Sequence, residues 1–445
     1  MKRILDHYLT EWRINPKRKP LVLRGARQVG KTHTVRNLGK LFNSYVEINF
    51  EQLPTVKDIF LKDLDPHRIL KELRLIIGKD ILPGETLLFL DEVQDVPQAI
   101  MALRYFYEEM PDLHVIAAGS LLDFAIEHIS VPVGRVSFLY MHPMSFIEFL
   151  AAIGEKHVLV EILEHNPKEV LSEPVHQKLL NYLGVYLAVG GMPEAVQAWV
   201  DTQNIIECSL VHDALIEAYR QDFEKYSKKL QLKYVELLFK SIPLFLGRPI
   251  KFNKISNDYR KRELAPCLSL LEKANIISKV TCTSGNGIPL GAEITPEKFK
   301  AIFLDVALSQ SMLGLDLKGW LLNPTRELIN KGEIAEAFIG QELLAYMAPQ
   351  KRADLYYWHR EVRGSNAEVD YLMQHQSNII PIEVKSALGT TLKSLHLFLE
   401  THALSPYGVR FSAHNYSVCE KVHSYPLYAV AGIFAENKEV LLTLI

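Results

Sequence analysis

Cysteine is scarce in this chain, which also lacks a large charge excess and any long apolar run. The 445 residues include 4 cysteines, which are scattered and form no Cys-X-X-Cys pair, so we expect neither a disulfide framework nor a zinc site of that type. The 50 basic and 52 acidic side chains give a net charge of -2. This balance argues against a generally basic nucleic-acid coat but permits local basic patches.

Sequences for membrane insertion or export are also missing. No stretch approaches the roughly 18 uninterrupted apolar residues of a membrane-spanning helix. The first residues, MKRILDHYLTEWR, are interrupted by charge and contain no apolar signal core. We therefore expect a cytoplasmic chain with no membrane partner. At roughly 100–200 residues per domain, the length predicts about two to four domains.

A loop near the N-terminus has the pattern of a phosphate-binding loop. It follows a short apolar strand candidate, residues 20–24, and precedes a helix candidate, residues 32–41. In loops of the form G-x-x-x-x-G-K-[ST], backbone N–H groups surround phosphate, the lysine reaches the β- and γ-phosphates, and the hydroxyl ligates Mg²⁺. The sequence therefore predicts that ATP and Mg²⁺ bind here. The loop consists of Gly25, Ala26, Arg27, Gln28, Val29, Gly30, Lys31 and Thr32.

Carboxylates follow the next buried strand candidate. The apolar run 86–90 ends in Asp91 and Glu92, and a carboxylate at the C-terminal end of a parallel strand can hold the Mg²⁺ shell. Glu92 would then orient or deprotonate the attacking water, unless the two acids only cap a following helix. A further apolar run, 114–118, leads to Ser120, which could contact the γ-phosphate or the water, or else serve as a helix N-cap.

Several motifs together resemble a known family. LRGARQVGKT, YVEINFE, LLFLDEVQ, AAGSLL, GRVSFLYMHPMSFIEFL and GGMPEAV occur in the order found in prokaryotic AAA-superfamily ATPases with an N-terminal AAA_14-type domain and a C-terminal DUF4143 region. The resemblance implies an ATP-binding parallel-sheet domain that uses the loop at 25–32 with Asp91 and Glu92. It also places Arg135 at a γ-phosphate, in cis or across a subunit interface, although this arginine could simply pair with an acidic neighbour. A homo-oligomer is left open.

The middle of the chain is predicted to be helical and then winged. The turn Gly190–Pro193 is interpreted as architectural, because glycine allows positive φ and proline can begin a helix. Between about residues 232 and 310, the order helix, helix, helix, strand, glycine-rich loop, strand favours a winged helix. The segment Tyr259–Arg262 lies where a recognition helix would begin and could meet phosphates. The alternative is a domain that uses the same fold for packing, with a solvated basic turn.

Acidic and basic side chains alternate along a strand candidate near the C-terminus. Glu383 and Lys385 flank Val384, and because alternate residues of a strand share a face, they point the same way. Asp370, in the preceding strand candidate 368–372, could join them. Two carboxylates with an ammonium beside them suit Mg²⁺ chemistry. Burial of such groups without partners would be costly, so the cluster predicts a site.

This arrangement resembles the PD-(D/E)xK nuclease-like fold. The resemblance implies that Glu336 on the preceding helix orients a ligand, that Asp370 and Glu383 bind metal, and that Lys385 assists attack. One departure is the short turn at residues 363–366. The alternatives are an ion-pair network in an inactivated fold and a strand edge with solvated charges.

We therefore predict an α/β protein of three parts. These are a P-loop AAA-type ATPase domain with a parallel sheet (1–170), a helical and winged-helix region (171–325) and a restriction-endonuclease-like PD-(D/E)xK domain (326–445). The preferred function is ATP hydrolysis that controls a Mg²⁺-dependent nuclease acting on nucleic acid, with DNA favoured over RNA. The alternative is a non-cutting, ATP-dependent protein that binds nucleic acid or a partner. A third hypothesis is a STAND-like sensor that signals through its oligomer.

Overall fold

The chain divides into two compact units, which are described separately. The computed structural model describes residues 1–120, 122, 134–226, 229–362, 365–385, 392–434 and 437–445. The N-terminal unit comprises Lys2–His142 and Ala348–Arg352, and the C-terminal unit comprises Met1, Pro143–Met347 and Ala353–Ile445. The predicted domain boundaries at residues 170 and 325 stay predictions. No helix within the described ranges combines the length and apolarity needed to cross a membrane.

The N-terminal unit is built on a five-stranded sheet in the order β2-β3-β4-β1-β5. All four neighbouring pairs are parallel, which confirms the predicted parallel-sheet P-loop domain. Strands buried on both faces read as continuous apolar runs, and β3 and β4 are buried along their whole length. The strands are β1 Leu21–Arg24, β2 Ser44–Asn49, β3 Thr86–Asp91, β4 His114–Ala118 and β5 Ser137–Tyr140.

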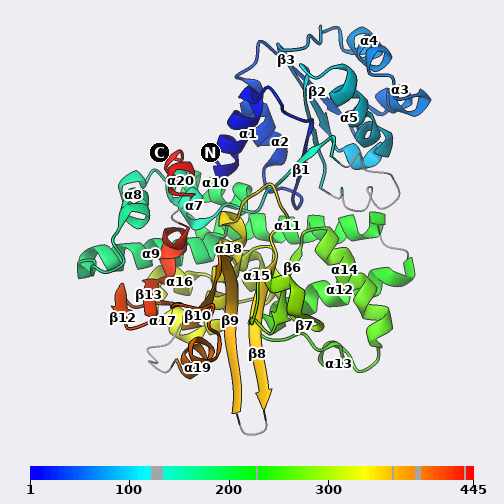
Figure 1. The fold of residues 1–445 in the computed structure, drawn as a ribbon. Helices are drawn as coiled ribbons and strands as arrows, with labels where there is room; N and C mark the ends of the chain where they lie inside the picture. Colours follow the sequence, from blue (N-terminus) through cyan, green and yellow to red (C-terminus); the bar gives the residue numbers. More distant parts are fainter. Residues whose placement is uncertain (121, 123–133, 227–228, 363–364, 386–391, 435–436) are drawn as a thin grey trace. The chain divides into compact units, whose positions relative to one another are not determined.

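Helices cover both faces of this sheet. Alternate residues of the strands, such as Leu88 and Leu90, pack with apolar side chains of α3, α4 and α5 in one buried cluster. Figure 1 shows α1 and α2 on the other side of the strands. The helices are α1 Ile4–Ile14, α2 Lys31–Gly39, α3 Lys57–Lys62, α4 Pro66–Ile77 and α5 Pro97–Glu109. The P-loop therefore lies between the end of β1 and the start of α2.

The C-terminal unit begins with helices and continues into an eight-stranded sheet in the order β12-β13-β11-β10-β9-β8-β6-β7. Strands β8, β9 and β10 are antiparallel neighbours, whereas β11 is parallel to β10. The long β8 and β9 lie side by side in Figure 1. The strands are β6 Ile277–Thr283, β7 Ile294–Phe303, β8 Leu355–Val362, β9 Ser365–His375, β10 Asn378–Lys385, β11 Gly408–Ser412, β12 Ser417–Cys419 and β13 Val422–Pro426.

The helices of this unit precede and interrupt the sheet. They are α7 Phe146–Ala152, α8 Lys156–Glu164, α9 Glu173–Val189, α10 Pro193–Thr202, α11 Ile205–Tyr226, α12 Lys229–Ser241, α13 Phe252–Ile255, α14 Lys261–Lys273, α15 Val306–Met312, α16 Lys318–Leu322, α17 Pro324–Asn330, α18 Gly332–Tyr346, α19 Lys393–Thr401 and α20 Lys438–Leu442. The order α12, α13, α14, β6, β7 follows the predicted helix–strand order. Because β6 also pairs with β8, these strands belong to the larger sheet, and the winged-helix interpretation stays a prediction.

The turn at Gly190–Pro193 is buried and held by a carboxylate. Gly190 has φ +78°, in the region that favours glycine. The N–H of Gly191 donates to Asp305 Oδ2 at 2.7 Å, and a Cβ added to Gly191 would lie 2.1 Å from the carbonyl oxygen of Met144. Pro193 begins α10. The geometry therefore gives the glycines of this motif a packing role.

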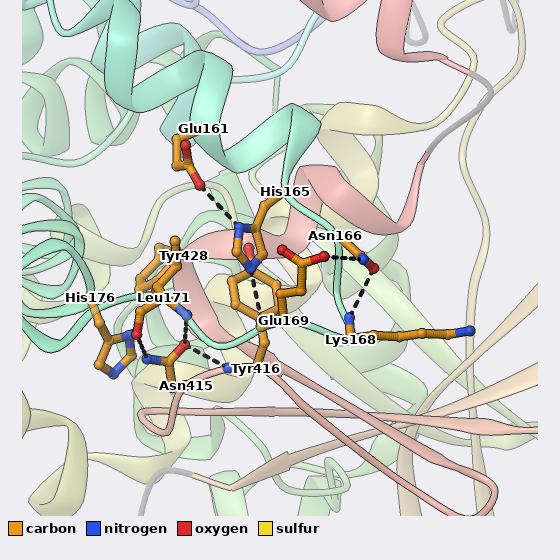
Figure 2. Close-up of polar contacts among 10 residues, drawn as sticks. All are labelled: Glu161, His165, Asn166, Lys168, Glu169, Leu171, His176, Asn415, Tyr416 and Tyr428. Atoms are coloured by element: carbon orange, nitrogen blue, oxygen red, sulfur yellow. Dashed lines mark hydrogen bonds and ion pairs between the residues drawn. The ribbon is translucent and has the colours of Figure 1, made fainter.

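A polar contact joins the helical part of this unit to the far end of its sheet (Figure 2). Asn415, between β11 and β12, donates from Nδ2 to the carbonyl oxygen of Leu171 at 2.8 Å and accepts from the N–H of Leu171 at 3.1 Å. The Asn415 Oδ1 also accepts from the N–H of Tyr416 at 2.9 Å. Nearby, His176 and the hydroxyl of Tyr428 lie 2.7 Å apart. Segments far apart in sequence are thus fixed by one amide.

We expect Asn415→Asp to lower the free energy of unfolding by about 1–3 kcal/mol, because a carboxylate oxygen would replace the amide donor that faces a carbonyl oxygen. Urea denaturation followed by tryptophan fluorescence measures the change. Asn253→Asp is the matched control, since Asn253 is exposed on α13. Equal unfolding free energies for the two variants would contradict the role given to Asn415.

Candidate functional site

The P-loop requires glycine where its backbone approaches its neighbours. A Cβ added to Gly25 would lie 2.3 Å from the carbonyl oxygen of Met141. Gln28 and Gly30 have φ of +62° and +101°, so the loop curls tightly before α2 begins at Lys31. The predicted residues Gly25 to Thr32 are therefore brought together as one loop around the N-terminus of a helix, the geometry that binds anions.

Lys31 lies inside this loop. Its Nζ donates to the carbonyl oxygens of Gly25 at 2.9 Å and Ala26 at 2.7 Å. Burial lowers the pKa of Lys31 to about 8, and Glu92 and Asp91 only partly oppose that effect. A phosphate in the loop would favour the charged ammonium, because opposite charge raises the pKa of an amine.

Arg3 supports the loop, and the sequence analysis missed it. Its guanidinium donates to the carbonyl oxygen of Val29 at 2.8 Å and to that of His142 at 2.7 Å. The side chain is buried. Nothing in the local sequence of α1 indicates this contact, because its partners lie in the P-loop and beyond β5.

A hydroxyl and a carboxylate meet beside the loop. Thr32 Oγ1 donates to Asp91 Oδ2 at 3.0 Å. Burial, with the charge of Glu92, raises the pKa of Asp91 to about 6. Hydroxyl and carboxylate oxygens are ligands that Mg²⁺ accepts in proteins, together with water and phosphate oxygens. Thr32 and Asp91 therefore fit the predicted Mg²⁺ site.

Glu92 and Ser120 follow two adjacent strands. Asp91 is in register with Ala118, so the residues after them lie at the same edge of the sheet. Glu92 has φ +55°, a left-handed conformation uncommon for a residue with a side chain. Its Oε2 accepts from Gln94 Nε2 at 2.6 Å. Ser120 is buried.

Arg135 has a partner of its own. Its Nε donates to Glu108 Oε1 at 2.9 Å, on the protein surface, and this contact raises the pKa of the guanidinium. Of the alternatives that the sequence left open, this pair is the one that the structure contains. The predicted contact with a γ-phosphate stays a prediction.

A second set of charged groups gathers in the C-terminal unit around Lys300, which the sequence analysis missed. The Nζ of this β7 residue lies 2.9 Å from Glu336 Oε1, 2.5 Å from Glu368 Oε1 and 3.8 Å from Asp370 Oδ1. Its side chain is 3% exposed. The three carboxylates supply the opposite charge that a buried ammonium group needs. Because Lys300 is far from the others in sequence, no spacing pattern could have linked it to them.

Glu383 and Lys385 complete this charged cluster. Lys385 Nζ lies 2.5 Å from Glu383 Oε1, and the N–H of Val384 donates to Asp370 Oδ2 at 2.8 Å. The structure thus brings the four predicted residues to one place. Glu383 Oε2 is buried and has no hydrogen-bond partner. An unpartnered buried carboxylate oxygen is costly.

The carboxylates of this cluster resist ionisation. Burial and the charge of Asp370 raise the pKa of Glu336 to about 8 and that of Glu383 to about 7. Burial also raises the pKa of Asp370. Burial opposes the charged form of Lys300 as well, but Glu336, Asp370 and Glu368 outweigh it and raise its pKa. Protons on these carboxyl groups, together with the ammonium groups of Lys300 and Lys385, therefore offset the negative charge of the cluster, and a bound cation would replace those protons.

No group of three His, Cys, Asp or Glu side chains in the described part of the chain is arranged to hold a metal ion. A site for Mg²⁺ needs fewer protein ligands, because this cation is usually held by one or two carboxylates with waters and phosphate oxygens. Asp370 and the unpartnered oxygen of Glu383 fit such a two-carboxylate site.

We expect affinity for Mg²⁺–ATP to be highest between about pH 6 and 8. Below about 6, protonation of Asp91 removes a metal ligand, and above about 8 Lys31 loses its charge. On each side of this range, the affinity should fall by up to about tenfold per pH unit. Calorimetric titration of Mg²⁺–ATP from pH 5 to 9 measures the affinity. Asp91→Asn is the control for the protonation of ATP itself, and parallel acid limbs in this variant and the wild type would contradict the role of Asp91.

Three models of protein families match the chain. An AAA domain of the AAA_14 family matches residues 17–150, a domain of unknown function (DUF8612) matches residues 181–319, and another (DUF4143) matches residues 331–430. No curated protein matches. A solved structure of a Walker-type ATPase from Pyrococcus abyssi is 16% identical, covers 70% of this chain and 95% of its own, and has a TM-score of 0.43.

The predicted AAA_14-type domain and DUF4143 region are thereby confirmed. The AAA match spans the P-loop and the strand that ends in Asp91. The chain is an ATPase with an N-terminal AAA-type domain, followed by two segments that match domains of unknown function.

Proposed function

We propose that this ATPase controls a Mg²⁺-dependent, nuclease-like site formed by the charged cluster, and that it acts on nucleic acid in the cytoplasm. The observation that carries the proposal is the buried Glu383 Oε2, which has no partner although it lies in a cluster with Asp370 and Lys385. The presence of a P-loop and of this cluster in one chain supports control of the second site by ATP.

The order of elements around the cluster supports the nuclease-like interpretation. Helix α18 carries Glu336, antiparallel strands β9 and β10 carry Asp370, Glu383 and Lys385, and β11 then pairs in parallel with β10 after α19. Antiparallel pairing places Tyr371 opposite Ile382, so Asp370 and Glu383 are brought close. The resemblance to the PD-(D/E)xK fold rests on these positions.

Each side chain of the cluster has a role in this proposal. Mg²⁺ held by Asp370 and Glu383 would polarise a phosphate and lower the pKa of a bound water. Lys385, half-buried beside Glu383, would hold that water or stabilise negative charge on the phosphate. Glu336 accepts from Lys300 at 2.9 Å and would keep this ammonium in place.

In the ATPase domain, we propose that the P-loop binds the phosphates of ATP and that Thr32 and Asp91 hold Mg²⁺. Glu92, at the end of β3, would act as the general base that takes the proton of the attacking water. Ser120 would contact the γ-phosphate or the water. Arg135 would do so only after leaving Glu108, in cis or in a homo-oligomer.

One observation favours a second function. Lys300 Nζ lies among Glu336, Glu368 and Asp370, where a cation would otherwise offset their charge. If this ammonium permanently replaces the metal, the C-terminal unit binds nucleic acid without cutting it, and ATP controls that binding.

A basic surface on α12, α13 and α14 suits the phosphates of nucleic acid under either function. Lys233 Nζ lies 4.7 Å from the ring centre of Tyr234 and 5.1 Å from that of Tyr259, which links α12 to the turn before α14. The basic surface consists of the exposed residues Lys233, Lys251, Lys254, Arg260, Lys261 and Arg262.

For the nuclease, we expect the wild type to nick plasmid DNA with Mg²⁺ or Mn²⁺, with a rate that changes when ATP is added. Asp370→Asn and Glu383→Gln each remove a metal ligand and should lower the rate by at least about 100-fold. The matched control is Glu361→Gln, because Glu361 forms an exposed pair with Lys298 on the same sheet.

Lys300→Met separates the two functions. If the wild type does not cut and the variant gains Mn²⁺ binding in a calorimetric titration, the ammonium replaces the metal and the binding function holds. Equal cutting by the wild type, Asp370→Asn and Glu383→Gln would contradict the nuclease assignment.

For the basic surface, we expect Lys261→Ala/Arg262→Ala to weaken binding of duplex DNA by about tenfold and to reduce the slope of log affinity against log salt by about 0.9 per lost phosphate contact. Fluorescence anisotropy in EDTA measures binding without cutting. Lys393→Ala/Lys421→Ala removes two exposed cations elsewhere in this unit. If both double variants bind alike, nucleic acid does not use this surface.

A further inference from the structure

Gln94 links the ends of two neighbouring strands of the ATPase sheet. It lies in the short turn Val93–Asp95 that follows β3. Its amide contacts Glu92, just after β3, and Gly119, just after β4. These strand ends are adjacent, since Asp91 and Ala118 are in register. None of the roles proposed above for the ATP site involves the side chain of Gln94.

The orientation of the Gln94 amide is fixed by chemistry. Glu92 Oε2 lies 2.6 Å from Gln94 Nε2, and an ionised carboxylate only accepts hydrogen bonds, so the amide nitrogen must face it. The amide oxygen therefore points the other way. Gln94 Oε1 is buried and has no hydrogen-bond partner, which is an arrangement with a free-energy cost.

Gly119 leaves the space that this amide occupies. A Cβ added to Gly119 would lie 2.2 Å from Gln94 Oε1, which is a steric clash. The nearest other atom, Leu122 Cδ1, would be 3.1 Å away. Any side chain at position 119 would therefore push the amide away from its place beside Glu92.

We propose that Gln94 is a positioning residue that holds the Glu92 carboxylate in the direction required for ATP hydrolysis. In that reaction the water oxygen forms a bond to the γ-phosphorus, the bond from phosphorus to the β–γ bridging oxygen breaks, and Glu92 takes the water proton, giving ADP and phosphate. The N–H of Gln94 fixes one oxygen of Glu92, which leaves the other to face the water.

Two observations beyond the hydrogen bond support this role. Glu92 has φ +55°, and strained conformations of this kind persist only where the surroundings hold them. The amide of Gln94 donates a hydrogen bond to Glu92 although its own oxygen, Oε1, is left without a partner. The inference rests on the proposed role of Glu92 in proton transfer.

The test compares Gln94→Met and Gln94→Glu with the wild type in steady-state ATP hydrolysis. Gln94→Met, which removes the donor at similar size, should lower kcat by about 10- to 100-fold while KM for ATP changes less than about twofold, since misdirected catalytic groups affect the reaction more than binding. Gly119→Ala should do the same. Gln98→Met is the matched control on α5, and melting temperatures verify folding.

Gln94→Glu places beside Glu92 a carboxylate, which cannot donate a hydrogen bond and carries like charge. The kcat of this variant should fall at least as far as in Gln94→Met, while KM for ATP again changes less than about twofold. This loss confined to kcat is the readout that a merely structural role would not give.

Two results would overturn the inference: unchanged kcat in Gln94→Met, or losses in Gln94→Met and Gln94→Glu that fall on KM for ATP as much as on kcat. Glu92→Gln separates this failure from that of the proposed function. If Glu92→Gln hydrolyses ATP normally, the role of Glu92 is wrong, and the inference fails with it. If it is inactive while Gln94→Met is normal, only the inference about Gln94 fails.

Discussion

Charge removed from water must meet opposite charge or hydrogen-bond partners, and both candidate sites are organised by that requirement. In the P-loop, Lys31 is surrounded by carbonyl oxygens, which accept hydrogen bonds but carry no full charge. The positive charge of Lys31 is therefore not neutralised within the loop, which favours binding of an anion. In the charged cluster, Lys300 is matched by carboxylates, and raised pKa values let Glu336 and Glu383 keep protons near neutral pH. A metal ion bound there would displace those protons, so the two sites take ligands of opposite sign.

The supporting contacts follow from where those charges lie. Two contacts hold the curvature of the loop around Lys31. Gly25 lies so close to neighbouring backbone that a side chain at this position would clash with it. Arg3 donates a hydrogen bond to the carbonyl oxygen of Val29. At the adjacent edge, Gln94 holds Glu92. In the charged cluster, the backbone of β10 holds Asp370 through the N–H of Val384. Neighbouring backbone and side chains therefore set the direction of each reactive group.

Local spacing was enough to predict part of this arrangement. The P-loop and Asp91 lie within contiguous patterns whose chemistry depends on near neighbours, and the alternation at Glu383 and Lys385 follows from the pleat of one strand. Lys300 and Arg3 could not be found in this way, because each meets its partners through tertiary packing. Gln94 was within the recognised motif, but only its contact with Glu92 shows which way its amide faces.

The sheet of the C-terminal unit has a consequence for inheritance. Strand β6 lies in the segment matching one domain of unknown function and β8 in the segment matching another, yet the two strands pair in parallel, with Val280 beside Leu355. Lys300 likewise comes from the first segment and its carboxylate partners from the second. Recombination between the two segments would split one hydrogen-bonded sheet and one set of charges. The matched segments therefore belong to one structural unit, and a substitution in one segment changes the packing or the charge that the other meets.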